Sequence, residues 1–151
     1  MKNNFTYDLL IIGGGISACV FASKYLQSNP RKKVALIEVG RRLGGRSSTR
    51  ISKRFKGWEL NHGAPNLNIC SRKNQQLQSY INELLENKFI KIDDSDIVFL
   101  NDDSNFETTR KSQFSYGVNY LSLDSMSQLS QNIIGSNNLK SKIDFYFETL
   151  I

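Results

Sequence analysis

The 151-residue chain has few cysteines and no long apolar segment. Its two cysteines, Cys19 and Cys70, stand far apart and outside any CxxC pair, which argues against a disulfide scaffold or a metal site. No apolar run approaches the roughly 20 residues of a membrane-spanning helix, and the N-terminus lacks the parts of a secretory signal. We therefore expect a cytoplasmic protein with no metal and no membrane partner.

Acidic residues are outnumbered, since 20 Lys and Arg against 14 Asp and Glu give a net charge of +6. An excess of this sign raises the question of nucleic-acid binding. The tyrosines and phenylalanines are dispersed, however, and much of the positive charge falls within residues 41–56. A cluster placed just after a predicted strand favours a local phosphate site. We therefore expect no nucleic-acid partner.

The chain opens with a strand–helix–strand pattern. Residues 7–12 are apolar in a way that predicts a parallel strand covered on both faces. Residues 16–27 have apolar positions at helical spacing, and Asn29-Pro30 ends the helix. Residues 33–39 predict a second buried strand. Together they predict a right-handed βαβ unit.

A glycine-rich turn links the first strand to the first helix. Gly13, Gly15 and Ala18 match the pattern G-x-G-x-x-G/A. Gly13 permits a tight exit from the strand, Gly15 leaves the backbone open to a pyrophosphate, and Ala18 lets the helix pack close to the sheet. The helix start at Ile16 and Ser17 directs N–H groups and a positive dipole end at the phosphate. These five residues form the predicted pyrophosphate site.

An acidic residue ends the second predicted strand. Glu38 lies twenty positions after Ala18, where a carboxylate accepts hydrogen bonds from the adenosine ribose hydroxyls. An acid here disfavours a 2′-phosphate, so NAD and FAD fit better than NADP. The alternative interpretation of Glu38 is an exposed charge at a strand end.

The sequence after Glu38, EVGRRLGGRSSTR, resembles the second flavoprotein motif of the amine-oxidase and renalase-like families. In these families an acid is followed by an Arg and then by Gly-Gly-Arg. Asn61-His62-Gly63-Ala64 resembles the D-x-G-A segment of the same families. The resemblance covers residues 7–64, and its pattern is most similar to the bacterial renalase-like group of FAD-dependent oxidoreductases.

The resemblance implies an FAD-dependent enzyme that takes a hydride from a small reduced substrate, either an amine or a dihydronicotinamide such as NAD(P)H. It implies cofactor binding by Arg42 and Arg46, whose guanidinium groups suit phosphate or ribityl oxygens. We interpret Arg41 and Arg50 as solvated cations. The matching positions where backbone would approach the cofactor are Gly44, Gly45, Gly63 and Ala64.

Two departures from the family pattern affect the flavin end of the site. Asn61 stands where the family has Asp, and Pro65 replaces the usual Gln after Gly-Ala. His62 is the only histidine, and we interpret it as a loop residue because hydride transfer to a flavin needs no imidazole. No Gly-Asp segment for the ribityl chain is visible in residues 100–151. We assign no catalytic side chain and no oligomeric state.

Beyond residue 64 the chain becomes rich in Asn, Gln and Ser. We predict an α/β fold, with a Rossmann-like FAD/NAD(P)-binding domain in residues 1–66. Residues 67–151 would begin a mixed α+β substrate or cap region that leads back to the cofactor domain. Because the last predicted strand runs to the final residue, we expect an incomplete architecture. A truncated, non-catalytic adenine-dinucleotide-binding module is the alternative function.

The remaining predicted elements are less regular. The hairpin 47–51 and 58–60 surrounds a turn at 53–57, and the strands 89–92 and 97–100 flank a turn at Asp93-Asp94. Amphipathic or half-buried patterns predict helices at 75–87 and 124–134 and a strand at 143–151.

Overall fold

The computed structural model describes residues 6–70, 73–95, 97–100, 103, 105–109 and 117–151. The chain divides into two compact units, residues 1–65 with 124–151, and residues 66–123. Each is described by itself. In unit 1 the last residues of the chain group with the first. The predicted substrate or cap region, residues 67–151 leading back to the cofactor domain, stays a prediction.

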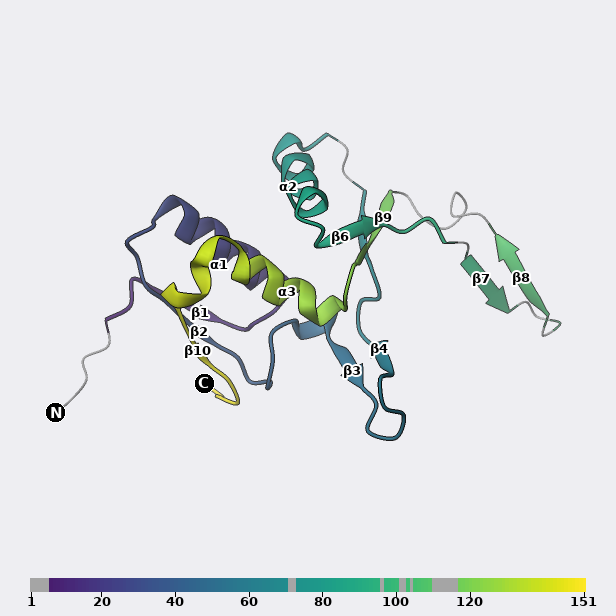
Figure 1. The fold of residues 1–151 in the computed structure, drawn as a ribbon, viewed down its shortest axis with the longest axis horizontal. Helices are drawn as coiled ribbons and strands as arrows, with labels where there is room; N and C mark the ends of the chain where they lie inside the picture. The colour runs from purple at the N-terminus through teal and green to yellow at the C-terminus, as the bar shows by residue number, and fades with distance from the viewer. Residues whose placement is uncertain (1–5, 71–72, 96, 101–102, 104, 110–116) are drawn as a thin grey trace. The chain divides into compact units, whose positions relative to one another are not determined.

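Unit 1 is built on a three-stranded parallel sheet with the strand order β1-β2-β10. The central strand β2 has the sequence VALI and is almost fully buried. The helices α1 and α3 pack against each other beside these strands (Figure 1). The bounds of the elements are β1 Leu9–Ile12, α1 Ile16–Ser28, β2 Val34–Ile37, α3 Met126–Gly135 and β10 Ile143–Tyr146.

The core of unit 1 follows from the apolar face of each element. Cys19, Ala22 and Leu26 of α1 are fully buried, as are Met126 and Leu129 of α3. This spacing of three or four residues places each set on one side of its helix. The βαβ expectation for the start of the chain is thus met by the observed strand–helix–strand order.

One face of β1 is open in the described structure. Leu10 and Ile12 are 54% and 71% exposed, whereas Ile11 between them is buried. Successive residues of a strand point to opposite faces, so only the face that carries Ile11 is covered. The prediction of a first strand covered on both faces is therefore wrong for the described residues.

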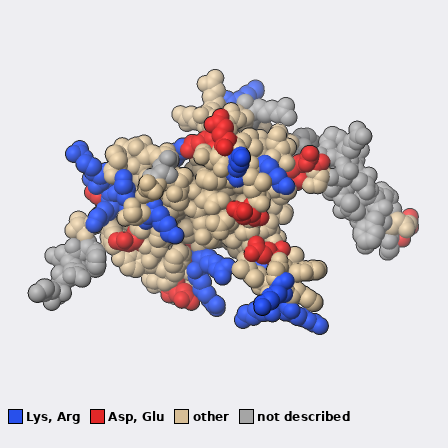
Figure 2. All heavy atoms as spheres, viewed as in Figure 1, with Lys and Arg blue, Asp and Glu red and all other residues tan. Residues whose placement is uncertain are grey.

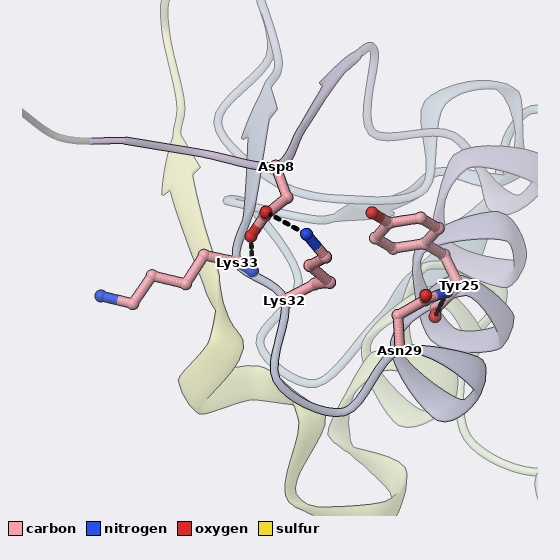
Figure 3. A network of polar contacts seen from close by, with 5 residues as sticks. All are labelled: Asp8, Tyr25, Asn29, Lys32 and Lys33. Carbon is pink, nitrogen blue, oxygen red and sulfur yellow. Dashed lines mark hydrogen bonds and ion pairs between the residues drawn. The ribbon is translucent and has the colours of Figure 1, made fainter.

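A polar network fixes the start of the parallel pair β1–β2 (Figure 3). Asp8 accepts hydrogen bonds from the Lys32 ammonium at 2.7 Å and the Lys33 backbone N–H at 2.9 Å. Its own N–H donates to the Lys33 carbonyl. The Lys32 side chain, followed by the Lys33 N–H, lowers the pKa of the Asp8 carboxyl. These bonds hold the two strand starts in register.

The strand β10 ends earlier than predicted. After Tyr146 the backbone turns at Glu148, which has a φ of 55°. The following N–H groups donate back to the loop after β2, from Glu148 to Gly40 and from Thr149 to Glu38. The alternating pattern of 143–151 predicted a longer strand because it could not reveal this left-handed residue.

Two 3-10 helices and a hairpin complete unit 1. A short 3-10 helix, η1 Gly45–Ser47, precedes the hairpin of β3 Thr49–Ile51 and β4 Glu59–Asn61. A second 3-10 helix, η3 Ser136–Lys142, joins α3 to β10. The hairpin was predicted within a few residues of these bounds.

Unit 2 contains the antiparallel sheet β5-β9-β6 and a separate β7–β8 pair. The helix α2 packs on β6, with Ile81, Leu84 and Ile90 buried. The predicted pairing of 89–92 with 97–100 is wrong, because β6 pairs with β9 and β7 pairs with β8. The bounds are β5 Leu67–Ile69, α2 Gln75–Glu86, β6 Ile90–Ile92, β7 Ile97–Leu100, β8 Phe106–Thr109 and β9 Val118–Ser122.

Candidate dinucleotide-binding site

The turn between β1 and α1 leaves open space beside two of its glycines. Gly13 has a φ of 93°, a left-handed conformation that favours glycine, and its N–H donates to the Ile37 carbonyl at 2.7 Å. A Cβ added at Gly13 or Gly15 would meet no atom within 4 Å. The turn therefore leaves free space against bare backbone, as a phosphate group requires.

The N-terminus of α1 has no side-chain cap. Its N-cap residue is Gly15, and its first turn contains no acidic residue. The helices α2 and α3, by contrast, are capped by Asn74 and Ser125, whose side chains accept from backbone N–H groups. The first-turn N–H groups of α1, at Ile16, Ser17 and Ala18, therefore remain available to an anion, and the helix dipole favours one there.

Glu38 is buried beside this turn. Its carboxylate accepts from the Gly14 N–H at 2.5 Å and from the Gly40 N–H at 2.6 Å. Each carboxylate oxygen keeps acceptor capacity for a further donor such as a ribose hydroxyl. Glu38 thus lies next to the glycine turn and not on an open strand end; the ribose contact itself stays a prediction.

Gly14 belongs to the site and was not predicted to. A Cβ at this position would lie 2.8 Å from Leu43 Cδ2 and 3.0 Å from Glu38 Oε2. A side chain at Gly14 would therefore displace Leu43 or Glu38 from its present position. The available signal was the third consecutive glycine, which the G-x-G-x-x-G/A pattern itself does not demand.

Gly44 and Gly45 pack against Gly14 and Gly15 of the turn. The Gly44 N–H donates to the Gly14 carbonyl at 2.8 Å, and a Cβ at Gly45 would lie 3.2 Å from the Gly15 Cα. Both residues also have positive φ angles, 126° and 51°. The structure gives a reason for these two glycines that the sequence did not, namely contact with the turn itself.

The segment at Gly63 and Ala64 lies against this same loop. The Ala64 N–H donates to the Arg46 carbonyl at 2.7 Å, and a Cβ at Gly63 would fall 1.8 Å from that oxygen. Backbone hydrogen bonds therefore join the predicted segments 13–18, 44–46 and 63–64, and the Glu38 carboxylate joins them through the Gly14 N–H. Whether each touches a cofactor stays a prediction.

The two predicted arginines have different surroundings. The Arg46 side chain is exposed in η1, whereas Arg42 lines a pocket of about 410 Å³ with Lys140, Phe145 and Phe147. No residue of the glycine turn lines that pocket. In the described part of the chain neither guanidinium has an ion-pair partner, while Arg41 lies 3.5 Å from Glu148. Both predicted arginines keep their charge free for an anion.

Asn61, where the resembled families have Asp, helps to cap α3. Its Oδ1 accepts from the Met126 N–H at 3.3 Å and from Thr49 Oγ1 at 2.7 Å, and Thr49 Oγ1 in turn accepts from the Ser127 N–H. Amide and carboxylate oxygens both serve as acceptors here. The neighbouring His62 is exposed, with Nδ1 3.4 Å from Ser48 Oγ.

Cys19 lies under the turn but offers no nucleophile. Its thiol is buried in α1, with Sγ 3.7 Å from the Gly14 carbonyl. Burial raises the pKa of this thiol to about 11, so it stays protonated at neutral pH. Among the described residues no group of His, Cys, Asp and Glu could hold a metal ion.

These features define an α/β protein with a dinucleotide-binding βαβ turn. Residues 11–84 match the family model described as NAD(P)-binding Rossmann-like domain. This match confirms the predicted Rossmann-like fold class, and the oxidase relative reported below supports the amine-oxidase side of the predicted family resemblance. A dinucleotide is the cofactor class of such a domain.

Several known proteins are similar to parts of this chain. It is 40% identical over 57 residues to (S)-6-hydroxynicotine oxidase from Paenarthrobacter nicotinovorans, which covers 38% of the chain and 13% of the relative. A solved putrescine oxidase bound to putrescine covers 73% of the chain and 23% of its own length, at 21% identity and a TM-score of 0.44. A putative protoporphyrinogen oxidase from Exiguobacterium sp. 255-15 covers 61% and 19%, at 27% identity and a TM-score of 0.42. The chain thus spans less than a quarter of each of these relatives.

No helix in the described ranges combines the length and the apolar character needed to cross a membrane.

Proposed function

We propose that this chain binds the ADP moiety of FAD for an oxidoreductase of the amine-oxidase type. The observation that carries the proposal is the open glycine turn at the uncapped start of α1, with the Glu38 carboxylate anchored beside it. In this proposal residues 13–18 hold the pyrophosphate and Glu38 the adenosine ribose. Arg42 and Arg46 add positive charge, and Gly63 and Ala64 lie toward the flavin.

When bound, FAD would serve as the acceptor of a hydride from a small reduced substrate. The residues of this chain would bind and orient the cofactor, and none is assigned to proton transfer. The resemblance to amine oxidases favours an amine substrate. A dihydronicotinamide such as NAD(P)H is the second substrate class. We place this activity in the cytoplasm, in line with two free cysteines.

A second candidate function is a non-catalytic adenine-dinucleotide-binding module. Its support is the parallel sheet β1-β2-β10, which has the three strands of one mononucleotide-binding half of a Rossmann fold. Such a half contacts the ADP portion, which FAD and ADP share. A module of this kind would bind both ligands with similar affinity.

Calorimetry and absorption separate these candidates. We expect the purified chain to bind FAD, with a flavin absorption band that survives gel filtration, and to bind ADP more weakly. Equal affinities for FAD and ADP, with no retained flavin colour, would support the module instead. A chain that binds neither FAD, ADP nor NAD would contradict both.

Gly15→Ala tests the glycine turn without disturbing the fold. A Cβ at Gly15 points into open space and its φ of −69° suits any residue, so the folded state should lose at most about 1 kcal/mol through the poorer N-cap. Because the methyl group occupies the phosphate space, we expect FAD and ADP to bind at least tenfold more weakly. Gly135→Ala, which also meets no atom within 4 Å, is the matched control and should leave binding unchanged.

A further inference from the structure

The β3–β4 hairpin, residues 49–61, presents a surface that the dinucleotide site does not use. Its strands pair in register from Thr49 with Asn61 to Ile51 with Glu59. The tip is ordered by hydrogen bonds from the Ser52 N–H to the Trp58 carbonyl and from the Phe55 N–H to Ser52 Oγ. The hairpin is therefore a defined structure that can present side chains.

The two faces of this hairpin differ. Thr49 and Asn61 share one face and accept N–H groups from the start of α3. Since side chains alternate along a strand, Arg50, Trp58 and Leu60 lie on the opposite face. That second face is not used to anchor the hairpin to α3.

Large apolar side chains are exposed on the hairpin. Trp58 is 62% and Phe55 is 52% exposed, and their ring centroids lie 5.5 Å apart. Leu60 and Ile51 are also exposed. Solvated aromatic and aliphatic side chains gathered on a small element mark an interaction surface.

Positive charge surrounds these apolar groups. Residues 49–61 contain four cations and one acid, Glu59, for a net charge of +3. The Arg54 guanidinium lies 5.3 Å from the centroid of the Phe55 ring. Figure 2 shows blue side chains around the tip of this hairpin, interleaved with tan ones. The cations are Arg50, Lys53, Arg54 and Lys56.

We propose that this hairpin docks the protein on the surface of an anionic lipid bilayer. Tryptophan and other aromatic rings favour the headgroup level of a membrane, where one end is apolar and the other wet. Lys and Arg are drawn to the negative potential of acidic lipids. The prediction of no membrane partner rested on the lack of a spanning segment and did not consider peripheral binding of this kind.

The aliphatic groups and the ring arrangement favour lipid over nucleic acid. Leu60, on the same face as Trp58, adds apolar surface that phosphate and base recognition does not need. Base stacking uses an aromatic face, whereas the Phe55 ring already contacts the Arg54 guanidinium and the Trp58 ring. An amphipathic tip of this composition matches the acyl and headgroup boundary.

Trp58 is the only tryptophan in the chain and so reports on the hairpin directly. We expect its fluorescence to shift to the blue when the chain meets vesicles of 70% phosphatidylcholine and 30% phosphatidylserine. Pure phosphatidylcholine vesicles should give no shift, and raising the salt from 0.1 M to 0.5 M should weaken binding, because the attraction is partly electrostatic. Vesicles with brominated acyl chains should quench the same fluorescence.

A charge-matched pair of variants locates the surface. The triple variant K53Q/R54Q/K56Q should bind the anionic vesicles at least tenfold more weakly in a sedimentation assay. The control K73Q/K88Q/K91Q removes the same charge from exposed lysines outside the hairpin and should bind like the unmodified chain. FAD binding should be unchanged in both variants, which separates this proposal from the proposed function and also shows that both fold.

Three results would overturn the proposal. One is an equal loss of vesicle binding in both triple variants, which would indicate net charge and not this hairpin. Another is a blue shift that grows with protein concentration in the absence of vesicles, which would assign the surface to a second copy of the chain. The third is the absence of a shift with anionic vesicles, and a shift on single-stranded RNA would then assign the surface to nucleic acid.

Discussion

The Glu38 carboxylate joins the two loops that border the candidate site. One oxygen accepts from the Gly14 N–H in a buried position, and the other accepts from the Gly40 N–H in a part-buried one. A carboxylate can accept at both oxygens, whereas an amide places a donor at one of them. The charge of Glu38 therefore has a structural task in addition to its proposed contact with ribose.

Glu38→Gln should destabilise the fold. Its NH₂ group would face a backbone N–H with no acceptor between them, and loss of a buried charge-assisted bond costs about 1.5–3 kcal/mol. Urea denaturation should show this decrease in the free energy of unfolding. Glu148→Gln, which removes an exposed carboxylate near Arg41, is the control and should change it little. Equal stabilities of the two variants would contradict the anchoring role.

Cys19 should make the fold sensitive to alkali. In the native state burial raises the pKa of its thiol to about 11, from an ordinary value of 9.0. Below pH 9 the thiol is protonated in both states and contributes no pH dependence. Above pH 9 the unfolded chain loses a proton that the native state keeps, so stability falls by at most about 2.7 kcal/mol by pH 11.

Comparison with Cys19→Ala isolates this contribution from other groups that titrate in alkali. Unfolding free energies of both proteins at pH 8 and pH 10.5 give the required difference. The alanine variant should be less stable at pH 8, because it leaves a small cavity in α1, but should lose less stability on going to pH 10.5. Parallel losses in the two proteins would contradict a raised pKa of Cys19.

Among single residues, the sequence predicted those whose role follows from a short motif. Glu38 and the glycines at 13 and 15 follow from a motif with fixed spacing. Gly14 and Asn61 did not follow, because their partners, Leu43 and the start of α3, are distant in sequence. Only the folded chain shows that position 14 has little room for a side chain and that position 61 must supply an oxygen acceptor.

Among the elements, the junction between η1 and the segment after β4 is the tightest backbone contact of the site. Gly63→Ala would place a Cβ 1.8 Å from the Arg46 carbonyl oxygen, so the two segments would have to separate. The hydrogen bond from the Ala64 N–H to that oxygen would then be lost. We expect a loss of at least about 2 kcal/mol in unfolding free energy, as for other overpacked positions.

Gly135→Ala serves again as control, because a Cβ there meets no neighbour within 4 Å and lies at the end of a helix. Its unfolding free energy should equal or slightly exceed that of the unmodified chain. Thermal melts of both variants measure the contrast. A Gly63→Ala variant as stable as the control would show that the contact relaxes without cost.

Element prediction succeeded where the signal was periodic and local. The bounds of α1 and β2 follow from apolar spacing and from the Asn29-Pro30 stop. The strands β6 and β7 were found, but their pairing was not, since β6 pairs with β9 about thirty residues further along the chain. The turn residues Asp93-Asp94 indicated a hairpin, and long-range pairing overrode that local preference.

For the whole molecule, the parallel sheet of unit 1 brings together distant parts of the sequence. β10 pairs with β2 more than a hundred residues away, and its following segment bonds back to Gly40 and Glu38. No local pattern could predict that the final residues of the chain would border the candidate site. The family resemblance predicted the class of fold but not which part of the region 67–151 returns to it.

Ligand binding should therefore protect unit 1 selectively. A ligand that binds only the native state stabilises it by about 2.7 kcal/mol at a hundredfold excess over its Kd. With FAD or ADP, amide hydrogen exchange should slow in β1, the first turn of α1, β2 and the segment after β10, because these surround the glycine turn. Peptides from α2 and β6 of unit 2 should exchange as before. Gly15→Ala, measured with the same ligand concentration, should reduce the effect in unit 1, to about 1.4 kcal/mol if its Kd is tenfold weaker. Equal protection of both units would show that they unfold together, and protection confined to unit 2 would place the ligand outside the glycine turn.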